Sequence, residues 1–249
     1  MKPYALISLV LAVLAGPGAL AQAAEVRVLS SNGVHSVMVE MVPAFERATG
    51  HKVSVDYYTA NQVIDQIKKG EAADLVIITR PTVDGLIKEG KIVKGSDKIL
   101  GRSGVGVAIK AGLTKPDIST PDKLKQALLD AKWIAFTKTG GSGIHVANVI
   151  KRLGIADQVY AKATTPEGGA VGPLVARGEA EMAIQQIPEL KAVKEIQYVG
   201  PLPKELQNFT VFTTGVMTNA RQPEAAKALI DFLATPAAVS LFKAKGFEP

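Results

Sequence analysis

Cysteine is absent from the 249-residue chain, and aromatic residues make up only 5% of it. Without cysteine the chain has no disulfide, no thiolate zinc ligand and no thiol nucleophile. The spacing of the histidines, His35, His51 and His145, fits no metal-ligand motif. We therefore expect no metal site and no other cofactor. Ordinary apolar cores, which 47% hydrophobic residues can supply, must hold the fold together.

Only one stretch of the chain is long and apolar enough to suggest a membrane-directed segment. The run Ala5–Ala15 follows Lys2, is broken at Gly16-Pro17-Gly18, and is succeeded by small-x-small cleavage sites at residues 19–23. A membrane anchor is the alternative, but a span needs roughly 20 consecutive apolar residues. The pattern predicts a cleavable signal peptide over residues 1–23 and a mature protein in the periplasm.

The charge pattern is mildly basic and dispersed. The formal net charge is +6, and the lysines and arginines are scattered among acidic residues. A nucleic-acid-binding protein would have a basic stripe interleaved with aromatic residues, so we expect no nucleic-acid partner. The excess charge would steer small anions toward a cleft, or it is simply a solubility surface. We expect a monomer.

Glycine-rich segments resemble catalytic motifs only superficially. Thr139–Gly143 lacks the Lys-Ser/Thr that follows in a nucleotide phosphate loop, and Gly104–Gly106 lacks the third glycine of a dinucleotide fingerprint. No Gly-x-Ser-x-Gly elbow joins a strand to a helix. These absences leave no recognisable catalytic constellation.

The order of apolar patterns predicts an α/β fold. Strand-like runs at Val26–Leu29, Lys52–Tyr57 and Leu75–Ile78 alternate with helical patterns, the first of which places Val37, Met41 and Phe45 on one face and stops at Gly50. Continuous apolar strands between helices indicate a parallel sheet that is covered on both faces.

The turns that follow the strands share one chemistry. They consist of small, hydroxyl or amide residues that lead into helix N-termini, where backbone N–H groups are free. Open α/β sheets bind ligands at these strand ends, and the composition is that of an anion cradle. The turns are Ser30–Gly33, Thr59–Asn61, Thr79–Pro81, Thr137–Gly143 and Gln185–Gln186.

Several segments together resemble the periplasmic molybdate-binding proteins of ABC importers and their wider kin. The resemblance rests on Val26–Gly50, Gln66–Leu75, Gly101–Lys110, Gly141–Gly143 and Ala237–Phe247, and it covers essentially the whole mature chain. It implies a two-lobed type II periplasmic-binding-protein fold, with the ligand in a cleft that closes by hinge motion and a membrane permease as partner. The lobes would comprise residues 24–103 and 104–211, and residues 212–249 would return to the first lobe.

The same resemblance also shows where this chain departs from molybdate binders. By our alignment, Gly33 and Ala60 stand where that family has serine hydroxyls, and Gln186 stands where it has a tyrosine. The third turn keeps the form that it has in the family, with Ser142 in it. Losing two hydroxyl donors is costly for a tetrahedral oxyanion in a dry cleft, so molybdate or tungstate is the lesser alternative.

Two arginines are candidates to hold a carboxylate. Arg80 directly follows a strand, and Arg102 lies at the expected crossover between the lobes. Either could instead be a surface arginine. If they bind ligand, replacing them with alanine should weaken binding strongly. The full set of ligand-binding candidates is Ser31, Asn32, Gly33, Asn61, Arg80, Arg102, Thr137, Gly141, Ser142, Gly143, Gly168 and Gln186.

The sequence thus favours a periplasmic solute-binding protein that captures a small organic anion, such as a di- or tricarboxylate, for an ABC importer. The alternative comes from relatives of this family that are enzymes: an isomerase like aconitate isomerase, which moves a proton on a tricarboxylate in the same cleft. His35, His145 or Glu167 could then serve as the base. Each histidine could equally be a surface or capping residue, and Glu167 a solvated loop carboxylate.

Overall fold

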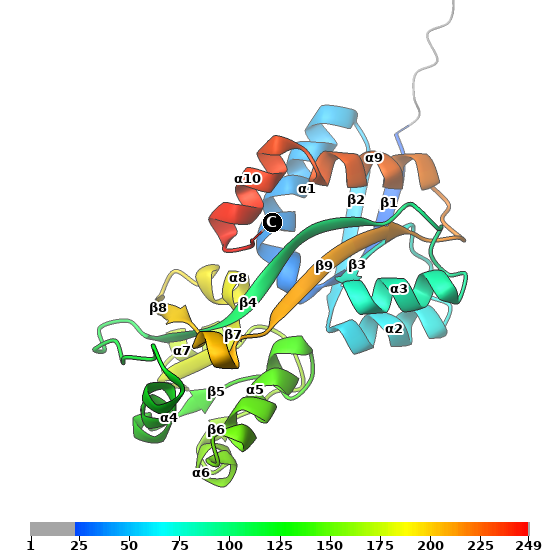
Figure 1. Cartoon of the computed structure of the whole chain (residues 1–249). Helices are drawn as coiled ribbons and strands as arrows, with labels where there is room; N and C mark the ends of the chain where they lie inside the picture. Colours follow the sequence, from blue (N-terminus) through cyan, green and yellow to red (C-terminus); the bar gives the residue numbers. More distant parts are fainter. Residues whose placement is uncertain (1–22, 249) are drawn as a thin grey trace, which may run out of the picture.

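The computed structural model describes residues 23–248, which form two lobes (Figure 1). The strands are β1 (Glu25–Ser31), β2 (Lys52–Tyr58), β3 (Leu75–Thr79), β4 (Lys98–Lys110), β5 (Ile134–Ala135), β6 (Ala163–Thr164), β7 (Met182–Gln186), β8 (Ile196–Pro201) and β9 (Phe209–Val216). The α-helices are α1 (His35–Thr49), α2 (Ala60–Lys68), α3 (Arg80–Lys88), α4 (Pro121–Asp130), α5 (Gly141–Arg152), α6 (Ala156–Tyr160), α7 (Gly172–Ala176), α8 (Ile187–Lys191), α9 (Pro223–Leu233) and α10 (Pro236–Lys245). Short 3-10 turns are η1 (Asn32–Val34) and η2 (Lys204–Leu206).

Two long strands connect the lobes. The sheet order is β2-β1-β3-β9-β4-β7-β5-β6, with β8 also paired to β4. Residues Lys98–Gly104 of β4 pair antiparallel with β9, and Val105–Lys110 pair with β7 and β8. The strand β4 therefore changes partners within its length, and the strongly bent sheet continues from one lobe into the other (Figure 1).

Each lobe has three layers, with helices on both faces of its part of the sheet. In the first lobe, α1, α9 and α10 pack on one face and α2 and α3 on the other. In the second lobe, α4, α5 and α6 cover one face and α7 and α8 the other. The predicted apolar face of α1 is confirmed, because Val37, Met41 and Phe45 are all buried. Its predicted end is confirmed by Gly50, which takes a left-handed conformation with φ of 76°.

Some expected turns are the first turns of helices. Arg80 and Pro81 begin α3, where proline fits because the first helical N–H groups lack partners inside the helix. Gly141, expected in a loop, likewise begins α5. The strand expected over residues 133–136 is reduced to Ile134–Ala135. These differences move residues that were expected in turns onto helix N-termini.

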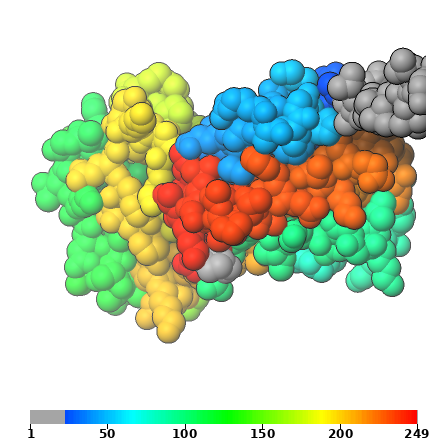
Figure 2. All heavy atoms as spheres, turned by 90° about the horizontal axis from the view of Figure 1, so that it is seen from above, coloured from blue at the N-terminus to red at the C-terminus, as the bar shows by residue number. Residues whose placement is uncertain are grey.

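The C-terminal segment is joined to the crossover. Arg102 N donates to Glu248 O and Glu248 N donates to Arg102 O, both at 2.8 Å. Figure 2 shows α10 lying directly against the second lobe at the boundary between the lobes. Within residues 23–248 no single helix is long and apolar enough to cross a membrane. Only α9 and α10 together, bent by 64°, match by length and composition, and both contribute side chains to the core.

Asp74 connects separate elements at the base of the first lobe. Its carboxylate is buried and accepts hydrogen bonds from Arg27 N on β1 at 2.8 Å, Arg221 N at 2.7 Å and Gln222 N at 2.8 Å. Removing it would leave three backbone donors without their acceptor.

We expect Asp74→Ala to lower the free energy of unfolding by about 3 kcal/mol. Asp65→Ala, at an exposed position on α2, is the matched control and should change it by less than about 0.5 kcal/mol. Urea denaturation followed by circular dichroism measures both. Equal effects of the two variants would show that the Asp74 hydrogen bonds contribute nothing specific.

Candidate functional site

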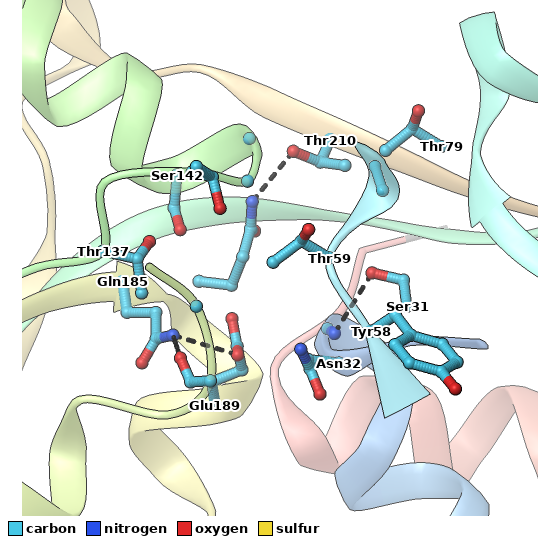
Figure 3. A pocket seen from close by; sticks show the side chains of 18 of the residues that line it. Ser31, Asn32, Tyr58, Thr59, Thr79, Thr137, Ser142, Gln185, Glu189 and Thr210 are labelled. Atoms are coloured by element: carbon cyan, nitrogen blue, oxygen red, sulfur yellow. Dashed lines mark hydrogen bonds between the residues drawn. The ribbon is translucent and has the colours of Figure 1, made fainter. Parts of the chain in front are cut away.

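A small cavity of about 50 Å³ lies between the lobes. Figure 3 shows polar side chains pointing into this space from both lobes, with Thr210 of the crossover beside them. Its lining is composed of hydroxyl, amide and small residues: Ser31, Asn32, Gly33, Tyr58, Thr59, Ala60, Thr79, Thr137, Thr139, Gly140, Gly141, Ser142, Gly168, Gly169, Gln185, Gln186, Glu189, Thr210 and Phe212. None of these lining residues is a lysine or an arginine.

Helix N-termini surround the cavity. Ala60 is the first residue of α2, and Gly141 and Ser142 open α5. The backbone N–H groups of a first helical turn have no intrahelical acceptor and carry the positive end of the helix dipole. The Ser142 hydroxyl adds a side-chain donor, and it makes no hydrogen bond with another described residue. This arrangement suits a negatively charged group without a formal countercharge.

Gln186 connects the cavity to both crossover strands. One end of its buried side-chain amide lies 2.8 Å from Thr210 Oγ1 on β9. With the amide oxygen accepting from Thr210, its nitrogen donates to Ser103 Oγ at 2.9 Å and Ser103 O at 3.1 Å on β4. A lining residue is thereby fixed to the two strands on which hinge motion would depend.

Glu189 is the carboxyl group of the cavity lining. It lies on α8 and accepts a hydrogen bond at Oε1 from Gln185 Nε2, at 3.0 Å. The amide of Gln185 is itself fixed, since its oxygen accepts from Val171 N at 2.9 Å and its nitrogen also donates to Gly169 O at 2.8 Å. Burial raises the pKa of Glu189 to about 8, because the charged form loses hydration. The group is therefore mostly protonated at neutral pH.

A second cavity of about 210 Å³ adjoins the first. It is lined by Asn32, His35, Ser36, Ala170, Glu189, Ala192 and Val193, so the two cavities share Asn32 and Glu189. A space of 50 Å³ accommodates a few waters or one anionic head group. A larger organic anion would therefore have to extend past Glu189 into the second cavity.

The two lobes touch at the cavity rim. A Cβ atom placed on Gly168 of the second lobe would lie 2.8 Å from Thr59 Cγ2 of the first, and one on Gly140 would lie 3.8 Å from it. Thr59 is held by a capping box with Gln62 at the start of α2. Glycine at position 168 thus permits the close approach of the lobes.

Most of the candidates that the sequence suggested lie together around the cavity. Those that line it are Ser31, Asn32, Gly33, Thr137, Gly141, Ser142, Gly168 and Gln186. Asn61 and Gly143 do not line it. Gly143 packs behind it instead, where an added Cβ would lie 2.0 Å from Thr137 O.

The two arginine candidates also lie outside the cavity lining. Arg80 forms ion pairs with Asp84 at 2.8 Å and Asp97 at 2.9 Å. Arg102 pairs with Glu248 at 3.0 Å, and its guanidinium carbon lies 4.7 Å from the centre of the Phe209 ring. Their charges are therefore matched by carboxylates within the protein.

The three candidate bases have different surroundings. His35 lines the second cavity and packs edge-on against Tyr57, with ring centres 4.5 Å apart. His145 Nε2 lies 2.6 Å from Leu206 O, and Glu167 is exposed and paired with Lys138 at 2.9 Å. Neither His145 nor Glu167 lines either cavity.

Sequence reasoning missed several lining residues. Thr59 and Gly140 belong to turns that were recognised, but they were not singled out. Thr210 and Glu189 could have been found from the crossover and from an acid that closely follows the strand ending at Gln186. No local signal shows that the Glu189 carboxyl group is partly buried, because its burial depends on packing between the lobes.

The position of Gly33 restricts what can replace it. A Cβ atom there would lie 2.4 Å from Phe212 Cζ and 2.7 Å from Cε1, inside the van der Waals distance. Phe212 is buried in the core of the first lobe and packs against Phe247. A serine at position 33 would require this ring to move, so the residue pair disfavours a side-chain hydroxyl at this position.

Comparisons with known proteins show which family this chain belongs to. The model of the bacterial extracellular solute-binding protein family matches residues 26–248. Aconitate isomerase from a Pseudomonas species is 34% identical over 228 residues, 89% of this chain and 87% of that protein. The molybdate-binding protein ModA of Azotobacter vinelandii is 28% identical over 255 residues, covering 98% of each chain.

Solved structures give the same fold. The periplasmic molybdate-binding protein of Azotobacter vinelandii superposes with a TM-score of 0.76 at 18% identity, covering 90% of this chain and 99% of that one. The predicted two-lobed type II periplasmic-binding-protein fold is thereby confirmed.

The close approach of Gly143 to Thr137, behind the cavity, predicts that one added methyl group has a large effect on stability. Gly143→Ala should lower the free energy of unfolding by about 3 kcal/mol, because its Cβ would overlap the Thr137 carbonyl. Gly85→Ala in α3 is the matched control, since no atom lies within 4 Å of its Cβ position. It should stabilise the protein by about 0.5 to 1 kcal/mol. Thermal denaturation of both variants tests the difference, and a Gly143→Ala variant as stable as Gly85→Ala would contradict it.

Proposed function

The chain belongs to the bacterial extracellular solute-binding protein family, and we propose that it binds a small organic anion, a carboxylate, in the cavity between its lobes. One carboxylate of the ligand occupies the small cavity. The rest of the molecule extends past Glu189 into the second cavity.

The neutral donor lining is the observation that carries this proposal. Hydroxyls, amides and free helix N–H groups converge on the cavity from both lobes, without a lysine or an arginine among the lining residues. Preorganised neutral donors bind an anion once water is excluded. The adjoining cavity supports an organic ligand over a compact oxyanion. The lack of room for a side chain at Gly33, beside Phe212, is our reason for ranking molybdate and tungstate lower.

The proposal includes a location and a partner. The N-terminal pattern predicts a signal peptide over residues 1–23, nearly all of which lie outside the described part of the chain. Together with the family membership, this supports a periplasmic protein that presents its ligand to the permease of an ABC importer. Binding as a monomer is part of the same proposal.

A second candidate function is isomerisation of the bound anion. The relative at 34% identity is an aconitate isomerase, and Glu189 supplies a titratable group at the cavity. Glu189 and His35 are the groups that this function would use for proton transfer, since both line the second cavity. His145 and Glu167 would have no access to a ligand there.

A thermal-shift screen of the purified protein tests the binding function. We expect stabilisation by trans-aconitate, citrate or another carboxylate, since a ligand at 100 times its Kd adds about 2.7 kcal/mol. Molybdate, tungstate and a neutral sugar are the comparison ligands. Stabilisation by molybdate or tungstate alone would exclude the organic-anion proposal.

Arg80→Ala and Arg102→Ala are variants outside both cavities, and we expect each to change the affinity for a stabilising carboxylate by less than about threefold. Their charges already form ion pairs, and exposed ion pairs contribute only about 0 to 1 kcal/mol. Calorimetric titration measures both. A loss of affinity of a hundredfold or more would show that these arginines contact the ligand.

Incubation with cis- or trans-aconitate in deuterated water separates the two functions. A carrier binds without chemical change, whereas an isomerase converts one isomer into the other or incorporates deuterium. Nuclear magnetic resonance of the recovered acid measures both outcomes. Glu189→Gln is expected to abolish any conversion, because an amide cannot accept the proton.

Closure of the lobes predicts a compensating pair of variants. Gly168→Ala should weaken carboxylate binding about tenfold, because its Cβ would lie 2.8 Å from Thr59 Cγ2. Thr59→Ser removes that methyl group but keeps the capping hydroxyl. The double variant should recover most of the affinity. Calorimetry would contradict the closed arrangement if Gly168→Ala alone bound as tightly as the unchanged protein.

A further inference from the structure

We infer that Glu189 binds the anion as a carboxylic acid, donating its own proton to an oxygen of the ligand, so that each anion held in the closed cleft is accompanied by one proton on this residue. The inference rests on the proposed function and deepens it. It makes anion binding by this protein a proton-linked reaction.

The position of Glu189 supports this role. It is the residue with an ionisable carboxyl that lines both cavities, at the point where they meet. Figure 3 shows its carboxyl group directed into the space between the lobes, toward the side that carries Ser142 and Thr59. A ligand that reaches from the small cavity into the second one must therefore pass this group.

The hydrogen bonds of the carboxyl group determine where the proton resides. Oε1 accepts from Gln185 Nε2, and the Gln185 amide is held in that orientation by Val171 N and Gly169 O. Oε2 makes no hydrogen bond or ion pair with another described residue. A carboxylate with one donor and no cation, partly removed from water, is poorly stabilised. Protonation places a hydroxyl at the oxygen that remains available to a ligand.

None of the cationic side chains described around Glu189 is placed to stabilise its ionised form. The other titratable groups that line the cavities are Tyr58, at the small cavity, and His35, at the second. Helices α1 and α10 of the first lobe also pack against α8. There, Lys245 of α10 forms an ion pair with Glu40 of α1. Lys191, on α8 itself, is exposed. Ionised Glu189 would therefore repel an anion beside it, whereas the acid form adds one more donor to a lining made of donors.

The consequence is a definite dependence on pH. Burial raises the pKa of Glu189 to about 8, so the acid form predominates below this value and is lost above it. Anion affinity should be constant at lower pH and fall about tenfold per pH unit above pH 8. At pH 9.5 the acid form is about 3% of the protein, which weakens apparent affinity about thirtyfold.

Calorimetric titration of the purified protein with trans-aconitate, citrate and molybdate tests the inference between pH 7 and 9.5. The carboxyl groups of the organic probes ionise below this range. At pH 9 we expect uptake of nearly one proton per bound anion, measured as a dependence of the heat on the ionisation enthalpy of the buffer. At pH 7 we expect almost none, because Glu189 already carries the proton.

Glu189→Gln is the decisive variant, since it keeps a donor of similar shape and cannot titrate. Its affinity should change by less than about threefold between pH 7 and 9.5, whereas that of the unchanged protein falls about thirtyfold, and its binding should take up no proton. Glu195→Gln, at an exposed glutamate beyond α8, is the control and should keep the full pH dependence. A carbon-13 titration, with the Glu189 signal identified by its absence from Glu189→Gln, should have its midpoint near pH 8.

The outcomes separate this inference from the function on which it rests. Tight binding of a probe with unchanged affinity to pH 9.5 and no proton uptake would overturn the role of Glu189 and leave anion binding intact. A midpoint below pH 6 for Glu189 would do the same. Failure of all three probes to bind at pH 7 would overturn the proposed function, and the inference with it.

Discussion

The antiparallel pairing of β4 with β9 is the constraint on which the whole molecule depends. These two strands carry the chain from one lobe to the other and back, and they are hydrogen-bonded to each other along Lys98–Gly104. Because β4 then pairs with β7, the strand that carries Gln185 and Gln186 is positioned by the same element. The cavity is placed where the lobes meet because both of its walls extend from this pair of strands.

In the proposed function, the cavity binds an anion through many weak donors rather than through one strong charge. The arginines nearest the crossover, such as Arg102, are already neutralised by carboxylates of the chain. Hydroxyls and helix N-termini remain as donors, and these cost less to desolvate than a full charge does. The exception is Glu189, whose charge state is controlled by burial and not by a cation. A site of this kind distinguishes ligands by shape and by the number of acceptor atoms they present.

Much of the fold could be predicted from the sequence because its signals are local. The buried face of α1 and its end at Gly50 follow from residue spacing and from one glycine, and the turn that supplies Ser142 was recognisable by composition. The arginines were assigned to the cleft on their chemistry and on their positions at a strand end and at the expected crossover. Their partners are set by tertiary structure: Asp97 reaches Arg80 from 17 residues away, and Glu248 reaches Arg102 from 146 residues away. The burial of Glu189 likewise depends on how α8 packs against the other lobe, which no local pattern encodes.

The junction between Arg102 and Glu248 places the end of the chain beside the strands that would bend during closure. A dye attached there would change its surroundings whenever the lobes move, without touching the cavity. The native chain has no cysteine, so a single thiol introduced near residue 248 would be labelled uniquely. A chain labelled in this way would serve as a fluorescent biosensor for its own ligand, with the dye beside the strands that connect the lobes.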